Sequence, residues 1–286
     1  MPPDFAVRRS AFRALHQSGC FVLPNSWDVG SARYLRHLGF RALATTSSGF
    51  AFTRGLPDNE TAVSRDIMLA HIAELAAATD LPVNADFQSC YGVRPEDVAE
   101  SVRLCIATGV AGLSIEDSTP DPARPLRDLS EALDRLRAAR AAVDASGTGV
   151  LLTARAECFL TGHPDPLREA IRRLQAYAEA GADVLYAPGP RSRDDIGAIV
   201  AAVAPKPVNV LVSSDIGMNL SDLAALGVRR ISVGSGLARA AWTGWVRAAK
   251  ALADHGTFTN FDGLVSFADL NALFTRTSAA DPQSNR

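Results

Sequence analysis

Short runs of apolar and β-branched residues alternate with longer stretches of helical periodicity along most of this chain. Between the fourth and fifth runs, Leu129, Leu133, Leu136, Ala139 and Val143 recur at the spacing of one helical face, with charged residues opposite. The pattern predicts a regular alternation of strands and helices. We expect eight strands: Cys20–Pro24, Ala42–Ser47, Pro82–Asp86, Gly112–Glu116, Val150–Arg155, Val184–Ala187, Val208–Leu211 and Arg230–Gly234.

Strands that are each followed by one helix return to the same edge of the sheet, so the expected pairing is parallel. An open, doubly wound sheet would show the same alternation. Eight regular units in about 240 residues fit a closed barrel better. No linker interrupts the series. The sequence therefore predicts an α/β fold, a (β/α)8 TIM barrel, as a single domain over residues 1–286.

The two ends depart from the alternation. Residues before about Cys20 predict a helix with Phe5, Phe12 and Leu15 on its apolar face, which we expect to cap the bottom of the barrel. Residues 257–276 predict an apolar C-terminal helical extension, which must dock on its own barrel or on a neighbouring subunit. We expect residues 277–286 to be disordered. The apolar side chains of the extension are Phe258, Phe261, Leu264, Phe267, Leu270, Leu273 and Phe274.

Composition narrows the class of protein. The chain is 47% hydrophobic, and 29 basic against 31 acidic residues leave a formal net charge of -2. This balance excludes a polybasic nucleic-acid or membrane contact and a mainly disordered chain. No apolar stretch is long enough for a bilayer, and the N-terminal residues lack the apolar region of a signal peptide. Because the four cysteines form no CxxC pair, we expect free thiols in a soluble cytoplasmic protein.

Polar residues gather where the predicted strands end, which is where the active site of such a barrel lies. Any one of them alone fits a loop cap or an interior salt bridge as well as a functional role. Together, carboxylates, one arginine and amides at six strand ends predict a small metal-assisted site for an anion. These residues are Asn25, Asp28, Ser47–Phe50, Asp86, Gln88, Glu116, Asp117, Arg155, Glu157 and Asn209.

Seven segments carry a resemblance that extends, in order and spacing, from about Phe21 to Leu252. The chain resembles the isocitrate lyase/phosphoenolpyruvate mutase superfamily. Within it, the chain is closer to the short oxaloacetate-decarboxylase-like, methylisocitrate-lyase-like and phosphonomutase-like members than to true isocitrate lyases. The segments are LPNSWDVGSARYLRHLGFRALATTSSGFAF, PVNADFQSCYG, LSIEDS, LLTARAECFL, AYAEAGADVLYAPG, KPVNVL and LGVRRISVGSGLARAA.

The resemblance implies a metal and a carboxylate site. Asp86 would hold Mg²⁺ directly and Glu116 would help through metal-bound water, a donor set that suits a hard divalent cation. Ser48, with the backbone amides of Gly49 and Phe50, would bind the substrate carboxylate in an anion nest.

The remaining roles also come from the resemblance. Arg155 would pair with substrate oxygens through its planar fork, which lysine lacks. Asp58 aligns with a carboxylate of the superfamily that either acts as an acid/base or supports the residues around the metal, and Asn209 is assigned to substrate binding. With the metal, these groups would stabilise the enolate of a 2-oxo acid.

The sequence departs from the superfamily at the metal loop. The usual pattern is D-x-[DE]-x-G-[YF]-G, whereas this chain reads DFQSCYG, so Gln88 replaces a metal-associated carboxylate and Cys90 a glycine. We therefore expect Mg²⁺ binding to be weak or lost. The loop STPDPARPLRD lacks the lysine-cysteine-glycine-histidine signature of the lyases, so the cysteines are not expected to be nucleophiles.

The expected function is a lyase that cleaves a carbon–carbon bond of, or decarboxylates, a small 2-oxo or 2-hydroxy carboxylate. Two alternatives stay open: phosphonopyruvate-type mutase or hydrolase chemistry, and a repurposed barrel with weakened metal binding. The glycines of Gly234–Gly236 are either a phosphate cradle or a tight strand-to-helix turn. The superfamily also implies a homodimer or homotetramer formed by exchange of C-terminal helices, and no nucleic-acid or membrane partner.

Overall fold

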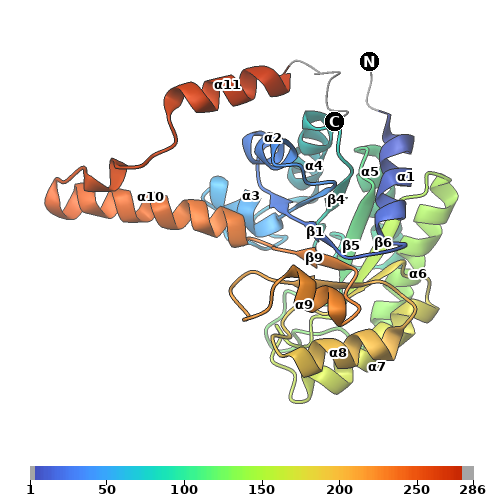
Figure 1. The fold of residues 1–286 in the computed structure, drawn as a ribbon. Helices are drawn as coiled ribbons and strands as arrows, with labels where there is room; N and C mark the ends of the chain where they lie inside the picture. The colour runs from blue at the N-terminus through green and yellow to red at the C-terminus, as the bar shows by residue number, and fades with distance from the viewer. Residues whose placement is uncertain (1–3, 279–286) are drawn as a thin grey trace.

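The computed structural model describes residues 4–278 and shows an α/β barrel of parallel strands (Figure 1). A strand lies within each of the eight predicted runs, which confirms the fold class. The strands are β1 (Phe21–Leu23), β2 (Asn25–Ser26), β3 (Leu43–Thr45), β4 (Val83–Ala85), β5 (Gly112–Glu116), β6 (Leu151–Arg155), β7 (Val184–Tyr186), β8 (Val208–Leu211) and β9 (Arg230–Ser232).

The barrel closes around Pro24: the predicted strand Cys20–Pro24 contains β1, and a second short strand, β2, follows it at Asn25–Ser26. β1 pairs with β9 and β2 pairs with β3, because a proline lacks the N–H that would continue one ladder. The Asn25 side chain joins the two sides of this break. Its Oδ1 accepts from the amides of Val233 and Gly234, and its Nδ2 donates to the Thr45 carbonyl at 2.6 Å.

Helices cover the outside of the barrel, with their apolar faces inward. In α6 the buried residues include Leu136, Ala139 and Val143, as the periodicity predicts. The helices are α1 (Phe5–Leu15), α2 (Val29–His37), α3 (Ser47–Thr53), α4 (Arg65–Ala78), α5 (Pro95–Ala107), α6 (Leu129–Ser146), α7 (Pro166–Glu179), α8 (Arg193–Val203), α9 (Leu220–Ala225), α10 (Gly236–His255) and α11 (Phe267–Ser278), with a 3₁₀ turn at Thr259–Phe261.

Helix α1 closes the bottom of the barrel, as predicted. Phe12 is completely buried in a cluster with Phe21, Leu23 and Leu151, which lie in β1 and β6. The His16 ring packs edge-on against Phe12 and Phe21, with ring centroids 4.7 and 5.1 Å apart. The barrel is therefore sealed at this end and open at the other.

Bulky branched side chains usually fill the interior of such a barrel. Below the strand ends, small or polar residues line the interior instead: Ala44, Asn84, Ser114 and Asn209. A cavity of about 400 Å³ consequently runs from the open mouth down between the strands.

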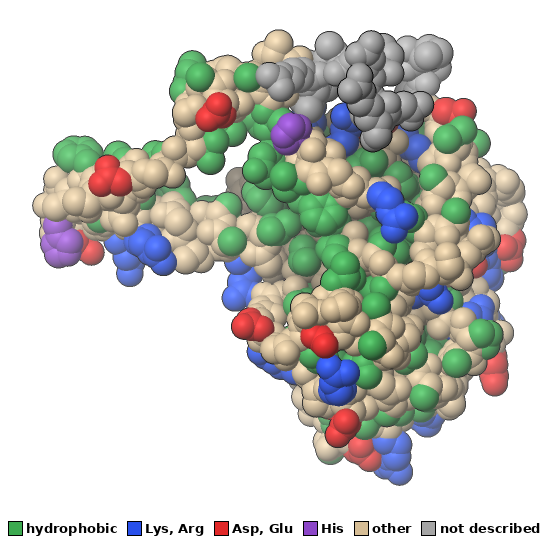
Figure 2. Space-filling view, in the orientation of Figure 1, with side chains coloured by type: hydrophobic (Ala, Val, Ile, Leu, Met, Phe, Trp, Pro, Cys, Tyr) green, Lys and Arg blue, Asp and Glu red, His purple; other side chains and the backbone are tan. Residues whose placement is uncertain are grey.

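Helices α10 and α11 form an arm that projects from the barrel and turns back toward α2 (Figure 1). Hydrophobic side chains gather along this arm (Figure 2), and Trp245, Phe258 and Phe267 are exposed by 62, 68 and 85%. Exchange of these helices between subunits stays a prediction. Of the tail that we expected to be disordered, Thr277 and Ser278 belong to α11, and residues 279–286 lie outside the described residues. Within residues 4–278, no helix is long and apolar enough to cross a membrane.

Candidate active site

The cavity opens at the C-terminal ends of the strands, where the sequence predicts the site. It brings together most of the predicted residues, but Asp28, Gly49, Phe50 and Asp117 are not among those that line it. The predicted residues that do are Asn25, Ser47, Ser48, Asp58, Asp86, Gln88, Glu116, Arg155, Glu157 and Asn209.

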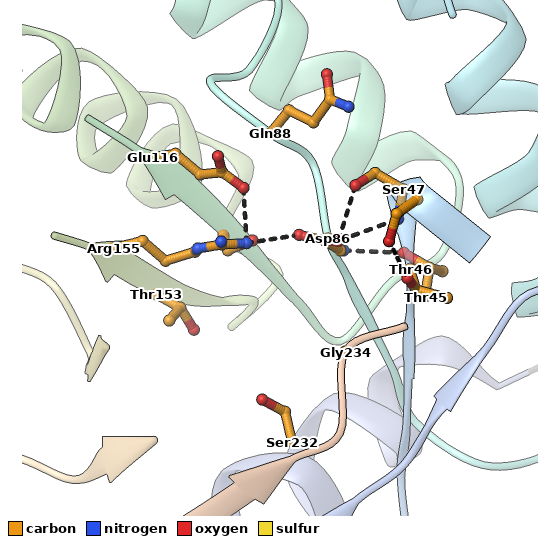
Figure 3. Close-up of polar contacts among 12 residues, drawn as sticks. Thr45, Thr46, Ser47, Asp86, Gln88, Glu116, Thr153, Arg155, Ser232 and Gly234 are labelled. Atoms are coloured by element: carbon orange, nitrogen blue, oxygen red, sulfur yellow. Dashed lines mark hydrogen bonds and ion pairs between the residues drawn. The ribbon is translucent and has the colours of Figure 1, made fainter. Parts of the chain in front are cut away.

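Arg155, the last residue of β6, lies among three carboxylates (Figure 3). Its Nη1 is 2.9 Å from Asp86 Oδ1 and 2.6 Å from Glu116 Oε1, and its Nε donates to Glu157 Oε1 at 2.8 Å. The guanidinium carbon lies 4.9 Å from the centre of the Tyr186 ring. One side chain thus ties together the ends of β4, β5 and β6.

The charged groups in this cluster shift one another's pKa values. Burial raises the pKa of Glu116 well above its ordinary value; Arg155 opposes this shift, and the neighbouring Glu157 adds to it. Burial disfavours the charged form of Arg155, but the attraction of Glu116 and Glu157 outweighs it and raises the pKa of Arg155 well above the usual range. Arg155 is therefore a fixed cation surrounded by an excess of carboxyl groups.

Asp86 is held in one orientation by both of its carboxylate oxygens. Oδ1 faces Arg155, while Oδ2 accepts from the amide and the hydroxyl of Ser47 at 3.0 and 3.1 Å. The Asp86 amide donates to Thr45 Oγ1 at 2.9 Å. This carboxylate is preorganised, because Ser47 at the start of α3 and Arg155 at the end of β6 both bond to it (Figure 3).

The predicted anion nest has a different form in the structure. Ser47–Phe50 are the first turn of α3, and the cap residue Thr46 accepts the Gly49 amide at its hydroxyl and the Phe50 amide at its carbonyl. Both amides are therefore used within the helix, and only Ser47 and Ser48 of this segment reach the cavity. A Cβ at Gly49 would lie 2.6 Å from Thr46 Cγ2, so close packing explains the glycine.

Asp58 and Gln88 are partners. Gln88 Nε2 donates to Asp58 Oδ1 at 2.9 Å, and the Gln88 side chain lies apart from the contacts between Asp86 and Arg155 (Figure 3). Burial, and then the charge of Asp86, raise the pKa of Asp58. The structure thus brings Asp58 into the cavity as a carboxyl group that retains its proton more readily than usual.

Glu60 is a site residue that strand-end reasoning missed, because it lies in the loop after α3. Its Oε1 accepts from the amides of Ser89 and Tyr91 at 2.8 and 3.4 Å. The loop after β4, which contains Ser89 and Tyr91, has three non-glycine residues in the left-handed region: Gln88, Cys90 and Tyr91, with φ of 48, 63 and 52°. Such residues cost about 1–3 kcal/mol each. Glu60 helps to hold this strained loop beside the site.

The donor set fits a magnesium ion in part. Asp86 and Glu116 both lie within 3 Å of one Arg155 nitrogen, and Asp58 and Glu157 add carboxyl groups that Arg155 alone does not neutralise. Magnesium binds through one or two carboxylates and several waters, so the pair of Asp86 and Glu116 is sufficient. Gln88 bonds to Asp58 instead, and residues 4–278 contain no cluster of three or more His, Cys, Asp or Glu side chains arranged as a metal site.

Two other sequence features receive simple explanations. Cys90 and Cys158 are buried, and burial raises the pKa of Cys90 well above its ordinary value and that of Cys158 to about 12, so the thiolates are disfavoured.

In the Gly234–Gly236 turn, the Gly234 amide donates to Asn25 and the Gly236 amide to the Val233 carbonyl. Both are thus already bonded, which favours a tight turn over a phosphate cradle.

Comparison with known proteins gives matches over most of the chain. The profile of the phosphoenolpyruvate phosphomutase family matches residues 12–253. A crystal structure of a candidate lyase/mutase from Burkholderia cenocepacia has a TM-score of 0.91 at 47% identity, covering 95% of this chain and 97% of that one. An oxaloacetate decarboxylase of Rhodopseudomonas palustris is 32% identical over 96% of this chain and 94% of its own length. A phosphonopyruvate hydrolase solved with oxalate and Mg²⁺ has a TM-score of 0.81 at 25% identity, covering 95% of this chain and 96% of that one.

Proposed function

This chain belongs to the phosphoenolpyruvate phosphomutase family, and on that premise we propose that it is a carbon–carbon lyase or decarboxylase of a small 2-oxo or 2-hydroxy carboxylate. The family consists of enzymes, lyases and mutases among them, and relatives bind small carboxylates such as oxalate. The observation that carries the proposal is the contact of Arg155 with Asp86, Glu116 and Glu157 inside the cavity.

Substrate binding is assigned to Arg155 and Ser48. Cleavage beside a 2-oxo group develops negative charge on the oxo oxygen as an enolate forms. A fixed cation at that oxygen stabilises the developing charge without having to reorganise. Ser48 lies in the cavity at the start of α3 and is assigned to the substrate carboxylate. The Gly49 and Phe50 amides are left out of this assignment, because Thr46 already accepts from them.

The residues that would hold a magnesium ion are Asp86 and Glu116. When bound, the ion would supply a Lewis acid for the substrate oxygens. The carboxylates of this chain hold the arrangement by themselves: Asp86 through Ser47 and Arg155, and Glu116 through Arg155.

We assign the role of proton donor to Asp58. Its raised pKa, caused by burial and by Asp86, allows the carboxyl group to retain a proton at Oδ and deliver it to the enolate carbon. The Gln88 amide, 2.9 Å from Asp58 Oδ1, orients this group. Because Gln88 is neutral, Asp58 experiences less electrostatic repulsion than it would from a carboxylate at position 88.

A second candidate is phosphonopyruvate-type mutase or hydrolase chemistry, which would use the same arginine and carboxylates. The loop after β5 is the reason to retain this second candidate. Thr119 and Pro120 line the mouth of the cavity, and Ser118 forms an antiparallel bridge with Leu126. We assign to this loop the control of which part of the substrate leaves, and its residues match neither the lyases nor the phosphonomutases.

One experiment separates these functions. Purified protein is assayed with oxaloacetate, methylisocitrate, dimethylmalate and phosphonopyruvate. Each assay is run once with about 5–10 mM Mg²⁺ and once with a chelator instead. Turnover of one of the first three, abolished in Arg155→Lys, is the expected result. Turnover of phosphonopyruvate alone favours the second candidate. No turnover of any substrate, together with no binding of oxalate in calorimetry, favours a repurposed barrel.

A further inference from the structure

A second buried arginine lies on the floor of the cavity, and the proposed chemistry gives it no role. Arg230, in β9, is only 2% exposed and lines the same cavity as Arg155. Its Nε donates to Asn209 Oδ1 at 2.8 Å and its Nη2 to Thr153 Oγ1 at 3.1 Å, and Nη1 lies 3.4 Å from His16 Nε2.

All of these partners are neutral. Burial, and then the charge of Arg230, lower the pKa of His16 to about 3, and its Nδ1 donates to the Phe12 carbonyl, so Nε2 is an acceptor. Within residues 4–278, no carboxylate forms an ion pair with Arg230. Burial lowers the pKa of Arg230 to about 9, which still leaves it cationic at neutral pH. A buried charge without a counterion is costly, and the guanidinium has donors left over after these contacts.

The two arginines in the cavity differ in whether carboxylates neutralise their charge. Arg155 faces Asp86, Glu116 and Glu157, so its charge is more than neutralised. Arg230 has no such neighbour. The upper part of the cavity is therefore negative, which suits a cation such as Mg²⁺ together with the 2-oxo end of the substrate. The floor is positive, which suits an anionic group.

The spacing of the two arginines follows from one strand. Thr153, which contacts Arg230, precedes Arg155 by two residues in β6, so both side chains point into the barrel. Two residues along a strand span about 7 Å. Arg230 is thus one barrel layer below Arg155, and the small residues Ala44 and Ser114 leave the space between these layers open.

We propose that Arg230, held by Asn209 and Thr153, is the subsite for a distal carboxylate, so that the enzyme selects dicarboxylates over monocarboxylates. This inference rests on the proposed function, because the head of the substrate is placed at Arg155. The distance of one barrel layer matches a short chain between two carboxylates. Arg230 is a specificity residue in this proposal, and Asn209 is a positioning residue that acts through it.

The test compares two ligands with the same five-carbon chain. 2-Oxopentanoate and 2-oxoglutarate differ only in the distal carboxylate, and their dissociation constants are measured by calorimetry in the presence of Mg²⁺, with oxalate as a ligand for the upper site alone. The variants are Arg230→Met, Arg230→Lys and, as a matched control, Arg229→Met. Arg229 is the adjacent arginine, and it bonds the Gly19 carbonyl outside the cavity.

We expect wild type and Arg229→Met to bind 2-oxoglutarate at least tenfold more tightly than 2-oxopentanoate. In Arg230→Met this ratio falls to within about twofold of one, Arg230→Lys restores part of it, and the oxalate affinity of both variants stays near that of wild type. A purely structural role would weaken all three ligands alike, and that result overturns the proposal, as does a wild type without preference. Failure of wild type to bind any of the three ligands overturns the proposed function, and this inference with it.

Discussion

Arg155 Nη1 lies 2.9 Å from Asp86 Oδ1, and this contact connects β6 to β4 across the intervening strand β5. Both side chains are mostly buried, exposed by 13 and 19%. The same nitrogen contacts Glu116 on β5. One guanidinium therefore sets the positions of carboxylates on two neighbouring strands, and removing its planar shape affects the whole site.

We predict that Arg155→Lys leaves the fold intact and lowers kcat/KM by on the order of a hundredfold or more. Lysine keeps the charge, but a single ammonium cannot face Glu157 with one nitrogen and Asp86 and Glu116 with another. Steady-state kinetics with the substrate found in the screen measure the loss, and far-UV circular dichroism checks the fold. Arg168→Lys, an exposed position on α7 that does not line the cavity, is the control. Near-normal turnover in Arg155→Lys would remove Arg155 from the site.

We predict that Gln88→Asp tightens Mg²⁺ binding. An added charge near a divalent ion in a partly buried site is worth on the order of 1–3 kcal/mol, or roughly ten- to a hundredfold in affinity. Calorimetric titration measures the change, and the neutral Gln88→Asn is the matched control. Equal affinities for wild type and Gln88→Asp would show that position 88 acts only through its bond to Asp58.

We predict that His71 makes the protein less stable in acid. Burial lowers its pKa to about 4, while an unfolded chain takes up the proton near pH 6.5. Because the unfolded state binds more protons in this window, the free energy of unfolding falls as the pH drops from 6.5 to 4, by up to about 1.4 kcal/mol per pH unit.

The variant His71→Phe isolates this effect. It keeps the stack with Phe50, whose ring centroid is 3.8 Å away, and removes a buried Nε2 that has no partner among the described residues. Urea unfolding at pH 7 and pH 5 should show a smaller loss for the variant than for wild type. The exposed His37→Gln is the control, and equal losses for wild type and His71→Phe would contradict the prediction.

We predict that the projecting arm mediates self-association. Exposed apolar side chains lie along α10 and the segment after it, among them Trp245, Phe258 and Phe267, and contiguous exposed apolar patches mark interaction sites. Truncation after Gly256 should abolish the oligomer or cause aggregation, as measured by analytical ultracentrifugation and size-exclusion chromatography. An unchanged oligomer that stays in solution after truncation would reject exchange of the C-terminal helices.

The sequence alone determined the strands and the side chains at their ends. β5 and β8 match their predicted bounds, and Asp86, Glu116 and Arg155 follow or end apolar runs that could only be buried strands. This works because alternation and helical periodicity are local patterns, and because parallel strands bring their C-terminal ends to one face of the barrel. The cap formed by α1 was readable for the same reason, from the apolar face that carries Phe12.

Only the tertiary structure decided which of these groups touch. Arg230 meets Thr153 across 77 residues of sequence and His16 across 214, and Gln88 turns to Asp58 on a different loop. The Gly49 and Phe50 amides are bonded within the chain because Ser47–Thr53 folds as a helix capped by Thr46, where the resemblance implied an anion nest. Such contacts depend on strand register, loop path and burial. These are set by packing between distant segments, so no local pattern of residues records them.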